Sequence, residues 1–196
     1  MIALKASGIK KEIYLSPYSF IATASAPAWL GIKLRFVDLD EDYKSPALVT
    51  HLYGEPNVVD TKPVIYDASH AFTTKIEGKS ILTFGDVSVI SFNAVKLFQT
   101  AEGGAVVTNN EEIAEKARWM RNFGFKTRYS FYGIGINCKM SEFHAAMGLC
   151  ALPLVKKMRK RYDELIARYN RAFNYGWNSV IYYPVQYSSE SKVLKA

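Results

Sequence analysis

The sequence has few cysteines and no long apolar run. Its two cysteines, Cys138 and Cys150, form no CxxC pair and have no histidine at the spacing of a metal site. This pattern argues against a disulfide framework and a zinc centre, and it predicts reduced thiols. No stretch reaches the ~18 apolar residues of a membrane span, and the first residues lack the apolar block of a secretory signal. We therefore expect a cytoplasmic protein with no metal and no membrane contact.

Acidic side chains are in the minority. The chain has 25 Lys and Arg against 18 Asp and Glu, a formal net charge of +7. A positive balance favours anionic partners such as phosphates, nucleotides or nucleic acid. The densest basic run, residues 156–161, alternates with apolar residues at helical spacing, which is typical of a solvated helix face. Because no nucleic-acid recognition motif accompanies it, nucleic-acid binding is the weaker alternative.

Apolar segments rich in β-branched residues predict a sheet. They are residues 33–40, 47–53, 63–69, 86–92 and 104–109. Several of these segments are almost continuously apolar, as strands buried on both faces are. Together with the helices between them, they predict an α/β fold of three layers, with a mixed, mostly parallel sheet between helices.

Two helices are predicted beside these strands. The first covers residues 19–31, where the terminal glycine suits a left-handed cap and Pro27 predicts a kink. The second begins after a capping box formed by Thr108 and Glu111 and ends at Gly124. Acidic residues in its first turn favour this start, because they interact with the positive end of the helix dipole.

The last third of the chain is predicted to form an appendage outside the main core. A helix begins at Ser141, is interrupted near Pro153 and continues as a long amphipathic rod. From Gly176 onward the sequence predicts one aromatic strand and then a polar tail. We expect a large domain over residues 1–150 and a connecting helix with a short second domain over residues 151–196.

Four polar residues follow predicted strands at the ends where open α/β sheets bind ligands. Asp67 and His70 follow one strand, and Ser91 and Lys96 follow another. A lysine beside a buried strand is partly desolvated, which lowers its pKa and frees a neutral amine to attack a carbonyl. A neighbouring aspartate can keep a pyridine nitrogen protonated, the arrangement that pyridoxal phosphate (PLP) needs as an electron sink. Ser91 is a candidate for binding the cofactor phosphate.

Each of these residues alone has an ordinary structural interpretation. A lysine is most often a surface residue, an aspartate often caps a helix and a serine often forms a turn. Their occurrence together, followed by a glycine pair that permits a tight return into the next strand, favours the functional interpretation.

Several motifs, in order along residues 9–172, resemble the DegT/StrS family of nucleotide-sugar aminotransferases, a branch of the fold-type I PLP enzymes. The segments that carry this resemblance are PYSFIATA, FVDLD, THLYG, VIYDASHAF, GKSILTFGDVSVISFNAVKLFQTAEGGAVVTNNEEIAEKARWMRNFGF and GINCKMSEFHAAMG. The lysine, aspartate and GINxKMSE motifs are independent of one another, so the resemblance is specific.

The resemblance implies two catalytic residues. Lys96 matches the lysine that holds PLP as an internal aldimine and then moves protons between substrate and cofactor. Asp67 matches the partner of the pyridine nitrogen. His70 stands where the family has glutamine or histidine beside the ring hydroxyl, so the resemblance makes it a cofactor-binding residue.

Three further cofactor-binding residues are implied by the same matches. Ser91 would bind the phosphate, and Phe20 stands where an aromatic side chain stacks on the ring. Asn137 matches the asparagine that reaches the phosphate bound by the neighbouring subunit. A site shared in this way implies a homodimer.

The reaction implied is transfer of an amino group from glutamate to a nucleotide-linked keto-deoxysugar, with thymidine diphosphate (dTDP) sugars the best match. Its order is ping-pong: glutamate converts the cofactor to pyridoxamine phosphate, 2-oxoglutarate leaves and the ketosugar takes the amine. The resemblance implies that residues 1–150 are a PLP-binding large domain with an incomplete N-terminus. Residues 151–196 are then a connecting helix and a truncated C-terminal small domain.

The sequence also departs from the family pattern. The N-terminal SGT-type phosphate-binding turn has no counterpart, and the segments between FVDLD, THLYG and VIYDA are shortened. Asn93 and Val95 stand where many relatives have histidine and threonine. These departures leave an alternative open: a catalytically weak or inactive family fragment that acts as a binding or assembly module.

Overall fold

A six-stranded sheet forms the centre of the molecule. The computed structural model describes residues 1–38, 41–173 and 176. Across the sheet the strand order is β2-β1-β3-β4-β7-β8, the first five strands running parallel and β8 antiparallel to β7. The strands are β1 (Glu12–Leu15), β2 (Lys33–Phe36), β3 (Ala47–Thr50), β4 (Val64–Asp67), β7 (Val87–Ser91) and β8 (Gly104–Val107). The predicted α/β class with a mixed, mostly parallel sheet is confirmed.

Three helices cover one face of this sheet. They are α1 (Ile2–Ala6), α2 (Ile21–Trp29) and α3 (Glu111–Met120). Buried side chains of α1, β1, β3, β4 and β7 form one apolar cluster, against which residues of α2 and α3 pack. Burial of this face supplies the hydrophobic free energy that orders the sheet.

The opposite face is covered by connecting segments. A second apolar cluster there includes Tyr43, Val49 and Tyr66, with Val59 and Phe84 packed against it. The connections after β2 and β3 are short, and residues 41–46 and 55–63 contain no helix. Two small hairpins, β5 (Lys75–Ile76) with β6 (Lys79–Ser80) and β9 (Phe125–Thr127) with β10 (Ser130–Phe131), lie outside the sheet.

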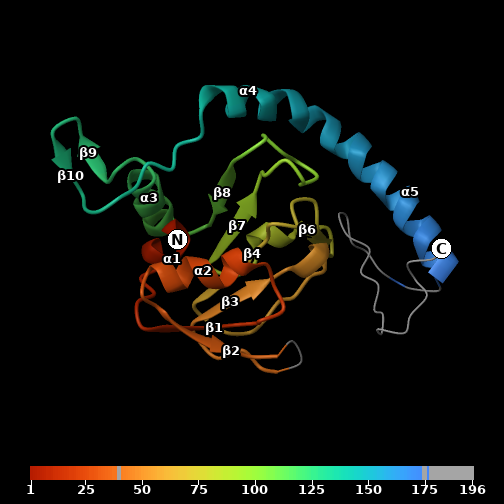
Figure 1. The fold of residues 1–196 in the computed structure, drawn as a ribbon, viewed down its shortest axis with the longest axis horizontal. Helices are drawn as coiled ribbons and strands as arrows, with labels where there is room; N and C mark the ends of the chain where they lie inside the picture. Colours follow the sequence, from red (N-terminus) through yellow and green to blue (C-terminus); the bar gives the residue numbers. More distant parts are fainter. Residues whose placement is uncertain (39–40, 174–175, 177–196) are drawn as a thin grey trace.

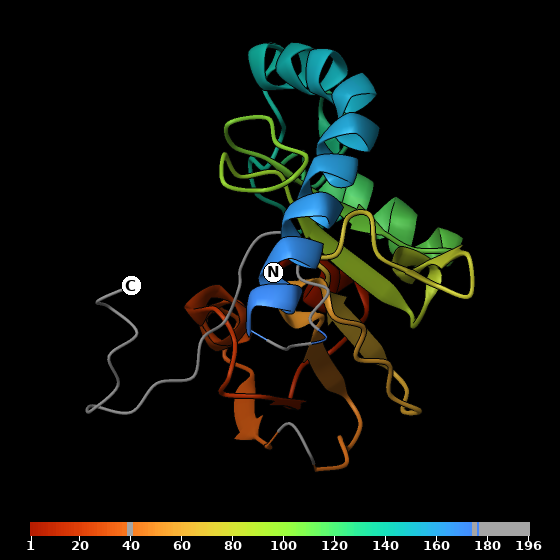
Figure 2. The same ribbon diagram turned by 90° about the vertical axis from the view of Figure 1, so that its right-hand side faces the viewer.

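The last two helices form a bent rod outside the sheet (Figure 1 and Figure 2). Ser141 caps α4 (Glu142–Ala151) by accepting a bond from the His144 N–H. A 3₁₀ turn containing Pro153 then leads into α5 (Val155–Phe173). The predicted start at Ser141, interruption near Pro153 and continuation are confirmed. The aromatic strand predicted after Gly176 lies outside the described residues.

The predicted boundaries of α3 are wrong at both ends. Its N-cap is Asn110, whose Oδ1 accepts a 3.2 Å bond from the Ile113 N–H. Thr108 instead donates its hydroxyl to the Asp86 carbonyl, which ties it to the sheet. The helix ends at Met120, and Gly124 adopts a left-handed φ of 80° in the turn that follows. The prediction of the start failed because threonine and asparagine can both cap a helix, and only tertiary contacts decide between Thr108 and Asn110.

Candidate active site

Parallel strands bring the predicted site residues to one edge of the sheet. Thr50 at the end of β3 pairs with Asp67 at the end of β4, and Asp67 pairs with Val89 of β7. Ser91 is the last residue of β7, two positions further along. These carboxyl ends therefore lie side by side, at the position where open α/β sheets bind ligands.

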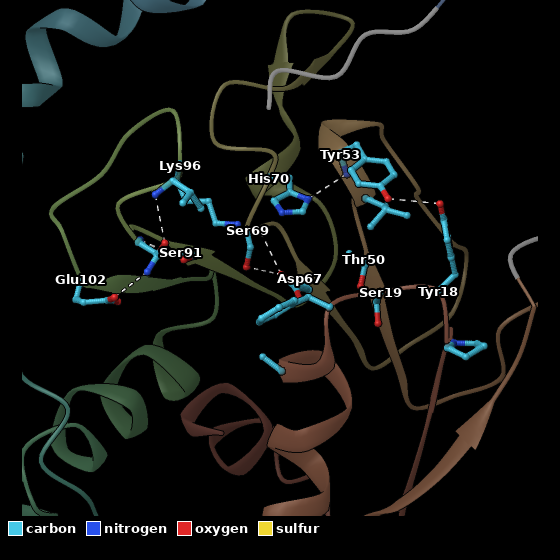
Figure 3. A pocket seen from close by; sticks show the side chains of 16 residues that line it. Tyr18, Ser19, Thr50, Tyr53, Asp67, Ser69, His70, Ser91, Lys96 and Glu102 are labelled. Atoms are coloured by element: carbon cyan, nitrogen blue, oxygen red, sulfur yellow. Dashed lines mark hydrogen bonds between the residues drawn. The ribbon is translucent and has the colours of Figure 1, made fainter. Parts of the chain in front are cut away.

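A cavity of about 740 Å³ opens at this edge. Five of the six predicted site residues line it: Phe20, Asp67, His70, Ser91 and Lys96. Figure 3 shows the Lys96 side chain reaching toward the side of the cavity that holds Asp67, Ser69 and His70. The segment before α2, the ends of β3, β4 and β7 and the turn before β8 supply its walls.

Asn137 is the exception. It is exposed, forms an isolated bridge with Asn122 and accepts a hydrogen bond from Lys139 Nζ. It does not line the cavity of its own chain. The structure therefore separates Asn137 from the other predicted site residues within one chain.

Lys96 lies on a short turn after β7. Its N–H donates a 2.9 Å bond to the Asn93 carbonyl, and the Val95 N–H donates to Asn93 Oδ1. Burial lowers the pKa of the half-buried Lys96 amine, and the negative charge of Asp67 partly opposes this effect. The amine is thus more easily deprotonated than that of a surface lysine while a carboxylate lies close enough to act on it.

His70 faces the same cavity as a neutral imidazole. Its Nδ1 accepts a 3.1 Å bond from the Tyr53 N–H. Burial lowers the pKa of His70 to about 4, helped by the positive charge of Lys96 and opposed by Asp67. The Tyr53 ring lies parallel to the imidazole, with 6.1 Å between ring centroids.

Tyr53 itself has a strained backbone. Its φ of 56° lies in the left-handed region, which residues other than glycine rarely adopt. This conformation occurs in the 3₁₀ turn Leu52–Gly54, directly after β3, and Tyr53 lines the cavity. Strain of this kind clusters at functional sites, where the surrounding structure maintains it.

Several residues of the site were missed at the sequence level. Tyr18 and Tyr53 line the cavity with their hydroxyls 3.4 Å apart, and Asn93 Nδ2 donates a 2.7 Å bond to Glu102 Oε1. Thr23 bonds to Asp67 from helix α2, 44 positions earlier in the chain. No local pattern marks Thr23, whereas Ser69, two residues after Asp67, has the spacing of a side-chain turn.

The groups in the cavity suit the ring end of PLP. An amine, a carboxylate and a neutral imidazole face one space, and these are the types of group that bind the aldehyde, the ring nitrogen and the ring hydroxyl. The phosphate end has fewer partners, because Lys96 is the one Lys or Arg among the lining residues that the structure describes. The residues present therefore fit the cofactor ring, and Ser91 is the predicted phosphate ligand beside them.

Two other kinds of site find no support in the part of the chain that the structure describes. Within it, no group of three or more His, Cys, Asp or Glu is placed to hold a metal ion. Within the same residues, no helix has the length and apolar character to cross a bilayer.

Comparison with known proteins finds sugar transaminases that are similar to this chain. The chain is 40% identical to a dTDP-4-amino-4,6-dideoxy-D-glucose transaminase of Shigella dysenteriae. The match extends over 176 residues and covers 76% of this chain and 47% of the relative. It is 32% identical to a UDP-4-amino-4,6-dideoxy-N-acetyl-beta-L-altrosamine transaminase of Campylobacter jejuni, over 88% of this chain and 54% of the relative. The chain thus spans about half the length of these relatives.

A solved structure shows the same fold. DesI, crystallised in the presence of its TDP-sugar product, superposes with a TM-score of 0.77 at 29% identity, over 87% of this chain and 50% of DesI. The sequence profile of the DegT/DnrJ/EryC1/StrS aminotransferase family matches residues 59–191, which include Asp67, Lys96 and Asn137. This chain therefore belongs to the DegT/DnrJ/EryC1/StrS aminotransferase family.

Proposed function

We propose that this chain is the PLP-binding part of a cytoplasmic aminotransferase that moves an amino group from glutamate to a nucleotide-linked keto-deoxysugar. The observation that supports this most is the placement of the Lys96 amine in one cavity with the Asp67 carboxylate. The aminotransferases of the family use PLP. We further propose residues 1–150 as the cofactor-binding large domain and residues 151–196 as a connecting helix with part of a small domain.

In this proposal Lys96 and Asp67 are the catalytic residues. PLP supplies an electron sink when it is bound. Lys96 holds it through Nζ, and burial of this amine favours the neutral form that can attack a carbonyl. The same amine, when free, would move a proton between the substrate carbon and the cofactor. Asp67 balances the positive charge of the protonated ring nitrogen.

The other lining residues bind and orient the cofactor. His70 accepts a bond at Nδ1, so its neutral ring carries the proton on Nε2, which would donate a hydrogen bond to the ring hydroxyl. Ser91, at the end of β7, binds the phosphate. Phe20, which is 71% exposed and lines the cavity, offers an apolar face against which the ring stacks.

A second copy of the chain completes the phosphate site. Asn137 lies outside the cavity of its own chain. Among the described residues that line the cavity, Lys96 is the one lysine or arginine. Several large apolar side chains near Asn137 are at least 70% exposed, among them Tyr129, Ile134 and Phe143. Large apolar side chains that are exposed in a single chain can be buried in an interface, so we propose that this segment contacts the partner of a homodimer.

The substrate proposal follows the relatives. The 40% identical Shigella protein is a transaminase of a dTDP-linked sugar, and DesI was crystallised with a TDP-sugar product. We therefore propose a dTDP-linked ketosugar as the amino acceptor. Glutamate gives up its amino group and leaves as 2-oxoglutarate, and the sugar carbonyl becomes a carbon bearing that amine.

One alternative has a specific observation in its favour. The chain spans 47% of its Shigella relative, and Lys96 is the one lysine or arginine among the described residues that line its cavity. A chain of this kind can bind PLP weakly and serve as a binding or assembly module without turnover. Uptake of PLP with no glutamate-dependent release of 2-oxoglutarate would favour this alternative.

The proposal is tested by titrating the purified chain with PLP and then with glutamate. We expect a new absorbance band in the near-ultraviolet or visible range, and borohydride should fix the cofactor to Lys96, as located by mass spectrometry. Lys96→Ala should abolish the fixed adduct, and Lys75→Ala, which removes an exposed lysine of β5, should leave it unchanged. No adduct at saturating PLP, or an adduct confined to other lysines, would overturn the proposal.

A further inference from the structure

The carboxylate of Asp67 is held by three hydrogen bonds from two residues. Oδ1 accepts one bond from the Ser69 N–H at 3.1 Å and another from the Ser69 hydroxyl at 2.6 Å. Oδ2 accepts one bond, at 2.7 Å, from the Thr23 hydroxyl. The two hydroxyl distances are in the short range of O–H bonds to an ionised carboxylate.

The number of bonds on each oxygen decides where a ligand can bind. A carboxylate has about four lone-pair sites, two on each oxygen. Ser69 occupies both sites of Oδ1, and Thr23 occupies one site of Oδ2. Among the described residues no further donor to Asp67 is present, so one acceptor site stays open, and it lies on Oδ2.

The surroundings hold the carboxylate in one orientation. Thr23 is 4% exposed and lies on helix α2, so it reaches Asp67 from an element other than the strand that carries the carboxylate. The main chain on either side of Asp67 is also held: the His51 N–H donates to the Asp67 carbonyl at 3.0 Å, and the Ala68 N–H donates to Val89 at 2.8 Å. Rotation of the carboxylate would break bonds to both Thr23 and Ser69.

We propose that Thr23 and Ser69 are positioning residues that leave Asp67 a single acceptor site, on Oδ2, for the cationic N–H of the cofactor ring. This inference rests on the proposed function, because it takes Asp67 as the partner of the ring nitrogen. Thr23 donates to Oδ2, the oxygen that would accept the N–H of the ring. Ser69 occupies both acceptor sites of Oδ1. The pair thus fixes both the orientation of the carboxylate and the atom that binds.

The test compares Thr23→Val, which removes the hydroxyl at nearly constant volume, with Thr23→Ser, which keeps it. Two properties are measured: the Kd for PLP by absorbance titration, and the protonation of ring-¹⁵N-labelled PLP by NMR. Thr23→Val should weaken PLP binding about tenfold, the order expected for loss of one hydrogen bond to a charged group, and should lower the protonated fraction of the ring nitrogen. Thr23→Ser should restore both.

Ser69→Ala keeps the main-chain donor but opens a second acceptor site, on Oδ1. We expect it to weaken PLP binding about threefold, as for loss of one of two bonds to the same oxygen. Thr83→Val, which removes an exposed hydroxyl that donates to the Ser80 carbonyl, is the matched control and should behave as the parent. Thermal unfolding without cofactor checks that each variant is folded.

The outcomes separate this inference from the function on which it rests. Absence of any Lys96 adduct in the parent chain overturns the proposed function. A parent that binds PLP with a protonated ring, and a folded Thr23→Val that matches it in Kd and ¹⁵N shift, overturns the positioning role alone. An equal loss in Thr23→Val and Thr23→Ser would also overturn it, because the hydroxyl would then not be the group that matters.

Discussion

The main-chain N–H of Tyr53 donates a 3.1 Å hydrogen bond to Nδ1 of His70. Because a main-chain N–H can only donate, Nδ1 must be the acceptor, and the neutral ring carries its proton on Nε2. The turn after β3 thus sets the tautomer of a residue that follows β4. The strained φ of 56° at Tyr53 is part of the same turn, which links the backbone conformation to the chemistry of the cavity.

Substitution of His70 tests this tautomer. His70→Gln keeps a side-chain donor, whereas His70→Ala removes it. We expect His70→Ala to weaken PLP binding about threefold to tenfold, the range for loss of one hydrogen bond, and His70→Gln to stay nearer the parent. The Kd from absorbance titration is the measurement, and equal values for all three chains would contradict a donor role.

The contact between Asn93 and Glu102 supports the turn that carries Lys96. Asn93 Oδ1 accepts the Val95 N–H while Nδ2 donates to Glu102. Asn93→Ala should loosen this turn and weaken PLP binding about threefold, a modest effect because the bond to Glu102 is exposed. Glu102→Gln keeps the acceptor oxygen and serves as the control. Equal Kd values for Asn93→Ala and the parent would show that the contact does not support Lys96.

The buried imidazole of His51 predicts a pH dependence of stability. It is 0% exposed, its Nδ1 accepts the Asn57 N–H, and burial lowers its pKa to about 4. The unfolded chain therefore binds a proton in a pH range where the folded chain does not, so stability is full above pH ~6.5 and falls as pH drops toward 4. The whole shift corresponds to about 3 kcal/mol of unfolding free energy.

Urea unfolding between pH 4.5 and 7.5 measures this effect in the parent chain and in His51→Gln. The variant should lose less free energy than the parent over the same range. His70 contributes in the same direction but is present in both chains, so the difference between them reports His51. Parallel curves for the two chains would rule out this assignment.

Gly104 permits the close pairing of β7 with β8. A Cβ at this position would lie 2.6 Å from the main-chain oxygen of Ile90. Gly104→Ala should therefore force the two strands apart and destabilise the fold by about 2 kcal/mol, the order of overpacking costs. Gly31→Ala, where φ is 70° but no atom lies within 4 Å, should cost only the left-handed strain of about 1 kcal/mol. Chemical denaturation compares the two, and a smaller loss for Gly104→Ala would contradict the close approach.

Much of the sheet could be predicted from the sequence because its strands are buried. All five predicted strand segments contain strands of the structure, and the edge that carries Asp67 and Ser91 follows from their parallel order. Strand β1 was missed because its four residues, EIYL, are too few to show an alternation of apolar and polar side chains. Its position between β2 and β3 depends on tertiary packing, which no local pattern shows.

The site was predictable where a chemically distinctive residue follows a strand end, or where a family motif marks the position, as it does at Phe20. Lys96, Asp67, His70 and Ser91 are of the first kind, and the structure brings them to one cavity. Thr23 has no such mark, because a threonine inside a helix is ordinary and its bond to Asp67 depends on how α2 packs against the sheet. The residues that hold the proposed catalytic groups were therefore harder to predict from the sequence than those groups themselves.

The place of Asn137 makes the proposed homodimer testable by mixing two defective chains. Lys96→Ala chains lack the amine, and Asn137→Ala chains lack the predicted phosphate ligand; each alone should bind PLP poorly. If Asn137 acts across the interface, a hybrid dimer contains one intact site, with Lys96 from one chain and Asn137 from the other. Random mixing of equal amounts should then restore PLP fixation in about a quarter of all sites, as a two-fold dimer requires.

Borohydride trapping and mass spectrometry of the mixture count the restored sites, and analytical ultracentrifugation measures the dimer. If Asn137 instead served the cavity of its own chain, no hybrid could contain an intact site, and mixing would restore nothing. Ile134→Glu places a charge on the exposed apolar region beside Asn137, where Ile134 is 84% exposed. It should lower both dimer formation and restoration, because an unpaired charge buried in an interface is costly. Restoration by Ile134→Glu chains that sediment as monomers would contradict the shared site.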